Sequence, residues 1–278
     1  MPQFFNDDQL DQLLFVAQAA AIEAGRKIQQ MRDTANVREK KTRDLVTDAD
    51  IQAQQLIARR LLGLFPDFGW IGEEDGRHAT PDPLQPTWLV DPIDGTANYA
   101  HRLPGYGVSI ALVLGGKTQV AVVHDPVSQE TFSAMQGFPA MKNGVAISVS
   151  GCQRMGEALI ASSFPPGVDR DSADVHQFLE VLSVSQSVRR LGSAALNLCH
   201  VACGRLDAYW TASVQSWDIA AGALICQQAG AIVTSATGGS FSVWDADLAV
   251  AASPQLHLEL LACLSRSPRS SGPGQTRT

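Results

Sequence analysis

The amino-acid sequence predicts a layered α/β sandwich, with an α+β N-terminal half over residues 1–149 and an α/β C-terminal half over residues 150–266. Two observations predict this class. The first half begins with two stretches of helical periodicity and continues with strands joined by short turns. In the second half, short strands alternate with apolar helices. At 278 residues the chain can bury a large core, as one big domain or two fused ones.

Helices are expected at the start of the chain. Residues 8–32 carry apolar side chains at helical spacing, and a second helix is expected from about Asp48 to Leu64. A polar, proline-rich loop should follow over residues 76–86. The apolar side chains expected on the buried face of the first helix are Leu10, Leu13, Leu14, Ala17, Ala20, Ala21, Ala24 and Ile28.

The remainder of the first half is expected to be mostly strand. An apolar strand leads into Asp91, and because Pro92 disfavours helix there, the strand should end at Asp91 in a turn. Residues 108–114 and 119–123 flank Gly115-Gly116, which predicts a hairpin. Gly115-Gly116-Lys117-Thr118 imitates the end of a phosphate-binding P-loop, but Ala111 stands where that motif needs glycine, so a turn is favoured.

The second half is predicted from alternating patterns. Helix is expected over 172–184, 193–203 and 217–229, and strand over 130–134, 145–149, 158–162, 187–191, 206–210 and 231–234. Cys199 and Cys203 fit no common zinc spacing and are expected inside a buried helix that ends at Gly204. Residues 267–278 are rich in Ser, Pro, Gly and Arg and are expected to be a disordered tail.

Composition narrows the function classes. Hydrophobic residues make up 45% and charged residues 18%, as in ordinary globular enzymes. The net charge of −7 and the lack of a block of Lys and Arg argue against nucleic-acid binding. No apolar run is long enough to cross a bilayer, the N-terminus is unlike a signal peptide, and the five cysteines are an odd number. A cytoplasmic protein with no membrane partner is therefore expected.

Four short segments carry acidic residues in suggestive positions. They are Thr47-Asp48-Ala49-Asp50, Gly72-Glu73-Glu74-Asp75, Asp91-Pro92-Ile93-Asp94-Gly95-Thr96 and Ser216-Trp217-Asp218. Taken singly, the first favours a helix N-terminus, the second a solvated turn, and the fourth either a helix start or a ligand.

The third segment is different, because its two carboxylates follow a strongly apolar strand, where acids are rarely left unpaired. Gly95 and Thr96 can open a helix whose N–H groups point toward the same centre as Asp91 and Asp94. Acceptors for a metal would then lie beside donors for an anion. The sequence shows no convincing triad that would activate a Ser, Cys or His nucleophile. If the protein is an enzyme, direct attack of water on its substrate is therefore favoured.

Together, in this order and at these separations, the four segments resemble the inositol monophosphatase family of magnesium-dependent, lithium-sensitive phosphatases. The signature elements are Gly-Glu-Glu, Asp-Pro-Ile-Asp-Gly-Thr and Trp-Asp-x-Ala-x-Gly, and the likeness runs from about residue 10 to 263. The resemblance implies an αβαβα sandwich like that of the inositol monophosphatases and fructose-1,6-bisphosphatases. It also implies a homodimer and inhibition by Li⁺.

Carried over by position, the resemblance implies the metal ligands. Glu73, Asp91 and the carbonyl of Ile93 would hold one Mg²⁺. Asp91, Asp94 and Asp218 would hold a second, and Glu73 would help with a third, weaker ion. The grouping is physically demanding, because two like charges about 4 Å apart repel by roughly 4 kcal/mol at an effective dielectric near 20. Hard oxygen ligands select Mg²⁺, or Mn²⁺ in its place, over zinc.

The resemblance also assigns residues to the substrate and the attacking water. Asp50 and Thr96 would orient and deprotonate the water, and Lys40 stands where bacterial relatives carry a Lys near the phosphate, although Lys41 could substitute. Gly95 and Thr96 would bind the phosphate through backbone N–H groups.

Gly192, Ser193 and Ala194 match the stretch that contacts the alcohol part of the substrate in the family.

One position departs from the family pattern. Inositol-hydrolysing members carry an acid seven residues before the aspartate of Trp-Asp, where this chain has Thr211. A hydroxyl cannot supply a charged acceptor, so a preference for inositol phosphate is in doubt.

The sequence therefore predicts a Mg²⁺-dependent phosphatase for a small phosphate monoester: an inositol-1-phosphate-like compound, a polyol or sugar phosphate, or histidinol phosphate. Relatives that cleave 3′-phosphoadenosine phosphates or fructose bisphosphate fit less well, because no basic patch for a second phosphate is evident. An alternative from another class is a regulatory binding protein with the same fold. Loss of any of the four acidic ligands would have favoured that alternative, and all four are present.

Overall fold

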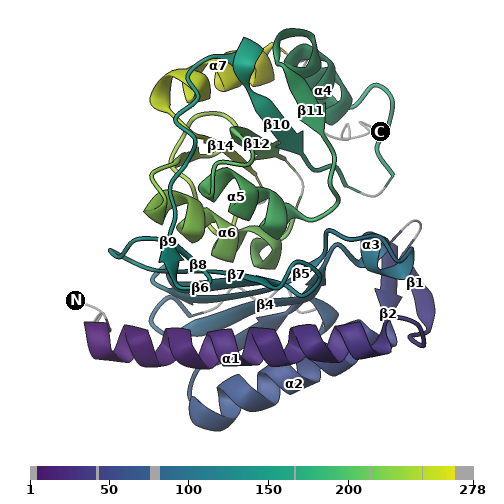
Figure 1. Cartoon of the computed structure of the whole chain (residues 1–278), viewed down its shortest axis with the longest axis vertical. Coiled ribbons are helices and arrows are strands. Elements are labelled where there is room, and N and C mark those ends of the chain that lie inside the picture. Colours follow the sequence, from purple (N-terminus) through teal and green to yellow (C-terminus); the bar gives the residue numbers. More distant parts are fainter. Residues whose placement is uncertain are drawn as a thin grey trace, which may run out of the picture.

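A computed structural model describes residues 5–41, 44–75, 82–165, 167–212, 214–245 and 247–266. Its elements stack in five layers, helix–sheet–helix–sheet–helix, which confirms the predicted αβαβα sandwich (Figure 1). From one end to the other, the layers are the pair α1 (Asp7–Met31) and α2 (Asp48–Leu64), a seven-stranded sheet, the pair α5 (Ala194–Ala202) and α6 (Ser216–Gln228), a five-stranded sheet, and the pair α4 (Ala173–Val184) and α7 (Pro254–Ser265).

The seven-stranded sheet has the order β3-β4-β5-β6-β7-β8-β9. Only β3 and β4 are parallel, and all other neighbours are antiparallel. The predicted turn at Gly115-Gly116 is confirmed, since both glycines have positive φ and the hairpin closes at Leu114 and Lys117. The strands are β3 (Gly69–Gly72), β4 (Thr87–Asp94), β5 (Gly107–Leu114), β6 (Lys117–Asp125), β7 (Glu130–Met135), β8 (Met141–Lys142) and β9 (Val145–Ala146).

The five-stranded sheet has the order β11-β10-β12-β14-β13. Strand β10 runs parallel to both β11 and β12, so the carboxyl ends of these three strands lie at one edge. Strand β14 is antiparallel to both of its neighbours. The strands are β10 (Leu159–Ser162), β11 (Ser187–Arg189), β12 (Ala208–Thr211), β13 (Ile232–Thr234) and β14 (Leu248–Ala251).

Three apolar clusters fill the spaces between the layers. One lies between the seven-stranded sheet and the pair α1 and α2 and contains Trp88 and Tyr106. A second surrounds α5 and α6, and the third lies between the five-stranded sheet and the pair α4 and α7 and contains Trp210. Cys199 is buried and free within the middle cluster, as expected, whereas Cys203 is half-buried at the C-terminal cap of α5. No helix within the described ranges is long and apolar enough to span a bilayer.

The prediction that the strand ends at Asp91 was wrong. Strand β4 continues to Asp94, and its register against β5 shifts by one residue between Asp91 and Asp94. Pro92 lies in this irregularity, which is where a sheet tolerates a residue without an N–H. The chain therefore bends within the strand instead of leaving the sheet.

Other differences are smaller. Pairing over the expected strand 145–149 is limited to Val145 and Ala146, and the hairpin of β1 (Val37–Lys41) and β2 (Asp44–Thr47) was not predicted. Neither were β3, β8, β14 and α7. The expected loop lies partly outside the described residues, at 76–81, and the expected tail lies wholly outside them. The division into two domains near residue 149 stays a prediction.

Candidate metal centre and active site

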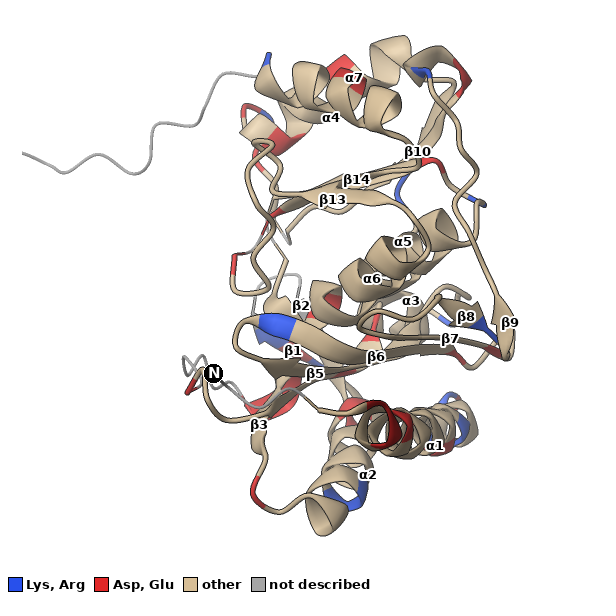
Figure 2. Ribbon diagram, turned by 90° about the vertical axis from the view of Figure 1, so that its left-hand side faces the viewer, with Lys and Arg blue, Asp and Glu red and all other residues tan. Residues whose placement is uncertain are grey.

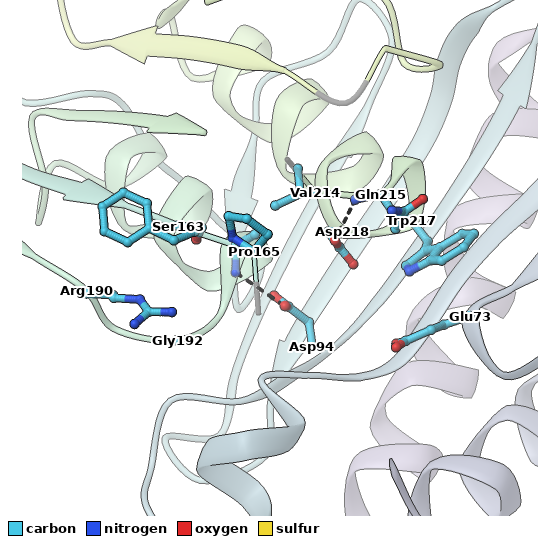
Figure 3. A pocket seen from close by; sticks show the side chains of 12 residues that line it. Glu73, Asp94, Ser163, Pro165, Arg190, Gly192, Val214, Gln215, Trp217 and Asp218 are labelled. Carbon is cyan, nitrogen blue, oxygen red and sulfur yellow. Dashed lines mark hydrogen bonds between the residues drawn. The ribbon is translucent and has the colours of Figure 1, made fainter. Parts of the chain in front are cut away.

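Three of the predicted metal ligands come together. Asp91 and Asp94 on β4 and Asp218 on α6 each offer a carboxylate oxygen, and these oxygens lie within 4.8 Å of one another. Asp91 and Asp94 are buried, with exposed fractions of 2% and 7%. The fourth acid, Glu73, lines the same cavity as Asp94 and Asp218 from the short 3₁₀ turn Glu73–Asp75, although it is not part of the 4.8 Å group (Figure 3).

The irregularity in β4 orients both of its carboxylates. The backbone N–H of Ile93 donates to Asp91 Oδ1 at 2.9 Å, which holds that side chain against its own bend. The Ile93 carbonyl accepts the Thr96 hydroxyl at 3.0 Å, so this carbonyl is held close to the acids. A strand that continued without the bend would place Asp91 and Asp94 on opposite faces, because side chains alternate along a strand.

Asp94 is held by the start of α5. Its carboxylate accepts the Ser193 hydroxyl at 2.5 Å and the backbone N–H groups of Ala195 at 2.6 Å and Ala194 at 3.3 Å. Burial raises the pKa of Asp94 to about 6, although these donors oppose the shift. Ser193, expected to contact substrate, is itself buried, with its hydroxyl directed at Asp94. In this structure it therefore positions the Asp94 carboxylate.

Asp218 is both a helix-start acid and a member of the cluster. It stands in the first turn of α6 and accepts the Gln215 backbone N–H at 2.8 Å, the capping arrangement that sequence alone could not separate from a ligand role. Burial raises the pKa of Asp91 and Asp218 well above the usual range for aspartate. Nearby carboxylates add to the shift, Glu73 first for Asp91 and Asp94 first for Asp218.

Asp50 and Thr96 also meet. Asp50 is buried in the first turn of α2, where one oxygen accepts the backbone N–H of Thr47 at 2.8 Å and its hydroxyl at 2.6 Å. The other oxygen is 3.2 Å from the Thr96 hydroxyl. Burial raises the pKa of Asp50 to about 6. The structure thus joins a proton-accepting group to a hydroxyl that also contacts the Ile93 carbonyl.

Lys40 approaches the acids from the β1–β2 hairpin. Its ammonium lies 3.1 Å from Glu73 and 2.6 Å from Glu74. Burial disfavours the charged ammonium, but the two carboxylates outweigh this effect and raise the pKa of Lys40. The side chain of Lys41, its predicted alternative, lies outside those described.

Two glycines are required where the halves of the chain meet. Gly95 has φ of +100°, and a Cβ there would lie 2.9 Å from the Gly105 carbonyl. Gly192 has φ of +93°, and a Cβ there would lie 2.6 Å from the amide of Asn98. That amide donates to the carbonyls of Gly105 at 2.8 Å and Leu191 at 2.7 Å. Asn98, which sequence reasoning missed, therefore ties the first half to the second beside the cluster.

The acids face a cavity of about 290 Å³ between the two halves (Figure 3). Gly192 and Ala194 line it, and their contact with the alcohol part of a substrate stays a prediction. Thr211 does not line it: the side chain is fully buried, and its hydroxyl donates to the Ser163 carbonyl at 3.4 Å. Thr211 therefore contacts the cavity-lining residue Ser163 instead of the cavity itself.

Sequence reasoning missed seven lining residues. They are Ser163, Phe164, Pro165, Arg190, Val214, Gln215 and Trp217. All of them follow the carboxyl ends of β10, β11 and β12, the edge where parallel strands commonly form ligand crevices. The three strands were predicted from the sequence. The tendency of ligands to bind at the carboxyl ends of parallel strands could therefore have identified the segments that follow them as candidate cavity walls.

Comparison with known proteins agrees with this geometry. The profile of the inositol monophosphatase family matches residues 9–269. A protein named Nus factor SuhB from Pseudomonas aeruginosa is 38% identical over 81% of this chain and 86% of its own length. Inositol monophosphatase 2 from Solanum lycopersicum is 38% identical over 84% of this chain and 91% of its own.

A solved structure extends the likeness to the fold. The extragenic suppressor protein suhB from Bartonella henselae superposes with a TM-score of 0.86 at 31% identity, covering 92% of this chain and 100% of that one. Sequence profile, relatives and fold all lead to the same assignment. The chain belongs to the inositol monophosphatase family.

Proposed function

We propose that the protein is a Mg²⁺-dependent phosphatase that hydrolyses a small phosphate monoester by direct attack of water. The observation that carries this proposal is the cluster of Asp91, Asp94 and Asp218, brought within 4.8 Å of one another beside a cavity of about 290 Å³. Family membership supports the reaction class.

The donor set fits a hard divalent cation. Buried carboxylates that raise one another's pKa need a counter-charge, and the described part of the chain gives the three clustered aspartates no Lys or Arg ion pair. All-oxygen ligands favour Mg²⁺ or Mn²⁺. When bound, such ions lower the pKa of water and offset charge on phosphoryl and leaving-group oxygens.

We assign the ligands by their place around the cluster. Glu73, Asp91 and the Ile93 carbonyl would hold one ion, and Asp91, Asp94 and Asp218 a second. Glu73 would contribute to a third. Lys40, which contacts Glu73 in this structure, would be released from it to face the phosphate when a cation takes its place.

The chain's own groups would handle the water and the substrate. The Thr96 hydroxyl would orient the attacking water, and the Asp50 carboxylate would accept the proton of that water. The Thr96 hydroxyl and the Asp50 carboxylate are already 3.2 Å apart. The N–H groups of Gly95 and Thr96 would bind the phosphate. Gly192 and Ala194 would contact the alcohol part across the cavity.

The test is phosphate release from a panel of monoesters with Mg²⁺, with Mn²⁺ and with EDTA. We expect turnover only with a divalent ion and its loss in Asp94→Asn. Asp11→Asn, an exposed acid on α1, is the matched control and should behave like wild type. Activity that survives in Asp94→Asn, or that ignores EDTA, would refute the proposal. The panel would include inositol 1-phosphate, sugar and polyol phosphates, and histidinol phosphate, which stays an alternative substrate.

A second candidate function comes from the name of a relative. The Pseudomonas aeruginosa protein is named a Nus factor, which favours a regulatory role through contact with a partner as an alternative for this chain. The test is to express the Asp94→Asn variant in cells from which this gene has been deleted. The variant should restore the lost function if that function is regulatory, and should fail to restore it if that function requires phosphatase activity. Restoration by wild type alone would exclude the regulatory alternative.

Two further properties are proposed from family membership, and a third from the charge of the chain. Millimolar Li⁺ should inhibit turnover, and indifference to it would end that proposal. The protein should sediment as a homodimer. Nucleic acid is not expected as a partner, because the net charge is −7 and the lysines and arginines are spread over several elements (Figure 2).

A further inference from the structure

One positively charged side chain is among the described residues that line the acidic cavity. Among the described lining residues, Arg190 is the only Lys or Arg, against three acids: Glu73, Asp94 and Asp218. Arg190 directly follows β11 and precedes the Leu191-Gly192 turn into α5. Figure 3 shows its guanidinium on the opposite side of the group of lining side chains from Glu73, with Asp94 and Asp218 between them.

Arg190 is supported without an acidic partner. Its guanidinium carbon lies 5.3 Å from the centre of the Phe164 ring, and Phe164 packs edge-on against Phe178 of α4 at 5.6 Å. No carboxylate within the described residues forms an ion pair with Arg190. Stacking on a ring occupies a face of the guanidinium and leaves its N–H edge able to bind an anion.

The neighbouring Arg189 behaves differently. Its guanidinium donates to the Ser187 hydroxyl and to the Val188 carbonyl, and it does not line the cavity. The two arginines therefore have the same charge and adjacent positions, but only Arg190 faces the site. Arg189 is a matched control for any effect of charge alone.

We propose that Arg190 selects phosphate monoesters whose alcohol part carries a second anionic group, a carboxylate or a further phosphate. This inference rests on the proposed function. The phosphate to be cleaved lies at the acid cluster, so the alcohol part extends toward the loops after β10 and β11. The other lining residues of those loops, including Ser163, Pro165 and Gly192, are uncharged, which leaves Arg190 as the group that distinguishes an anionic alcohol from a neutral one.

The experiment compares pairs of substrates that differ in one anionic group. The carboxylate arm uses 3-phosphoglycerate against glycerol 3-phosphate, and the phosphate arm uses fructose 1,6-bisphosphate against fructose 6-phosphate. We expect the wild type to favour the anionic member of at least one pair in kcat/KM. Arg190→Met should reduce that preference about fivefold or more, the range for a charge-assisted hydrogen bond weakened by solvent. Arg189→Met should leave the preference unchanged, and added salt should reduce it.

The outcomes separate this inference from the proposed function. If no monoester is hydrolysed with Mg²⁺, the proposed function fails. If the wild type hydrolyses monoesters but Arg190→Met and Arg189→Met show equal preferences, the inference about Arg190 fails alone. A preference lost only in the carboxylate arm, or only in the phosphate arm, supports the inference and identifies the anionic group.

Discussion

Acidic side chains have opposite surroundings in two regions of this protein. At the Asp91–Asp94–Asp218 cluster, burial and mutual repulsion raise the pKa values. On β7, Glu130 lies 2.5 Å from Arg205 and 3.2 Å from Lys142, and these cations lower its pKa to about 2. The chain supplies the counter-charge for Glu130, whereas the described residues give the three clustered aspartates no Lys or Arg ion pair. Carboxylates with raised pKa values beside a cavity are candidates for a functional site, whereas a paired surface carboxylate is not.

The largest expected effect is at the centre of the cluster. In Asp91→Asn we expect kcat to fall about 10³-fold, since a metal ligand is lost that supports several kcal/mol of transition-state stabilisation. In EDTA at neutral pH, the same substitution should raise the melting temperature by about 2 °C or more, because folding no longer has to protonate a buried carboxylate or bury its charge. Calorimetry with and without Mg²⁺ measures this, and the stabilisation by Mg²⁺ should disappear.

The wild type and Asp11→Asn are the references. An Asp91→Asn protein that is less stable than wild type in EDTA would mean that the cluster is not under repulsion. The comparison with Glu130 would then lose its basis.

Asp50 should separate proton transfer from metal binding. Asp50→Asn keeps the shape of the side chain but removes the proton acceptor, so kcat should fall about 10²-fold or more. Stabilisation by Mg²⁺ should persist, because Asp50 contacts Thr47 and Thr96 rather than the clustered aspartates. Asp48→Asn is the control, since Asp48 pairs with Arg38 and Asn36 on the surface. Joint loss of activity and of the Mg²⁺ effect would instead make Asp50 part of the metal centre.

The two sides of the cavity were unequally predictable from sequence. Asp91, Asp94 and Thr96 are encoded within six residues, so short-range spacing after an apolar strand was enough to find them. Ser163, Arg190 and Gln215 reach the cavity from loops after three different strands. Their convergence depends on strand order, which the sequence pattern does not contain.

Local physics also misled in places. Pro92 correctly indicated a break in regular pairing, but the sheet accommodated it by a shift of register instead of ending the strand. The assignment of Ser193 to substrate came from the resemblance and stays a prediction, while its hydroxyl is directed at Asp94 in the structure. The short strand β3, with two glycines among its four residues, carries little strand signal and forms by pairing with β4.

The contact of Asn98 with the Leu191-Gly192 turn, which joins the first half of the chain to the second, can be tested through Gly192. Gly192→Ala combines a left-handed backbone conformation with a collision at Asn98, and we expect a loss of about 1–3 kcal/mol in unfolding free energy. Gly151→Ala has a similar φ of +76° but nothing within 4 Å, so it reports the backbone strain alone. Urea unfolding of both variants gives the difference. Equal losses would show that the Asn98 contact contributes nothing.

The smallest expected effects concern the pH dependence of the free energy of unfolding. They test most directly the contrast between Glu130 and the Asp91–Asp94–Asp218 cluster. Glu130 has a folded pKa of about 2 against an ordinary value of 4.5, so its stabilisation is complete above about pH 4.5 and is lost as pH falls toward 2. Asp94 has a folded pKa of about 6 against an ordinary 3.8, so the folded state holds the extra proton and stability decreases as pH rises from about 4 to 6.

Stability therefore rises with pH where Glu130 titrates and falls with pH where Asp94 titrates. A substitution at Glu130 should change the first slope, and a substitution at Asp94 the second. In EDTA, Glu130→Gln should reduce the rise between about pH 2 and 4.5 by about 1 kcal/mol or less, since the pair is partly exposed. Asp94→Asn should make the decrease between about pH 4 and 6 smaller without abolishing it, because the pKa values of Asp50, Asp91 and Asp218 are raised as well. The lower range should be unchanged. Saturating Mg²⁺ should reverse the decrease in the wild type, because the cation binds only the ionised cluster. Urea unfolding at constant ionic strength measures all three, and a decrease of the same size in Asp94→Asn as in the wild type would mean that Asp94 contributes nothing to it.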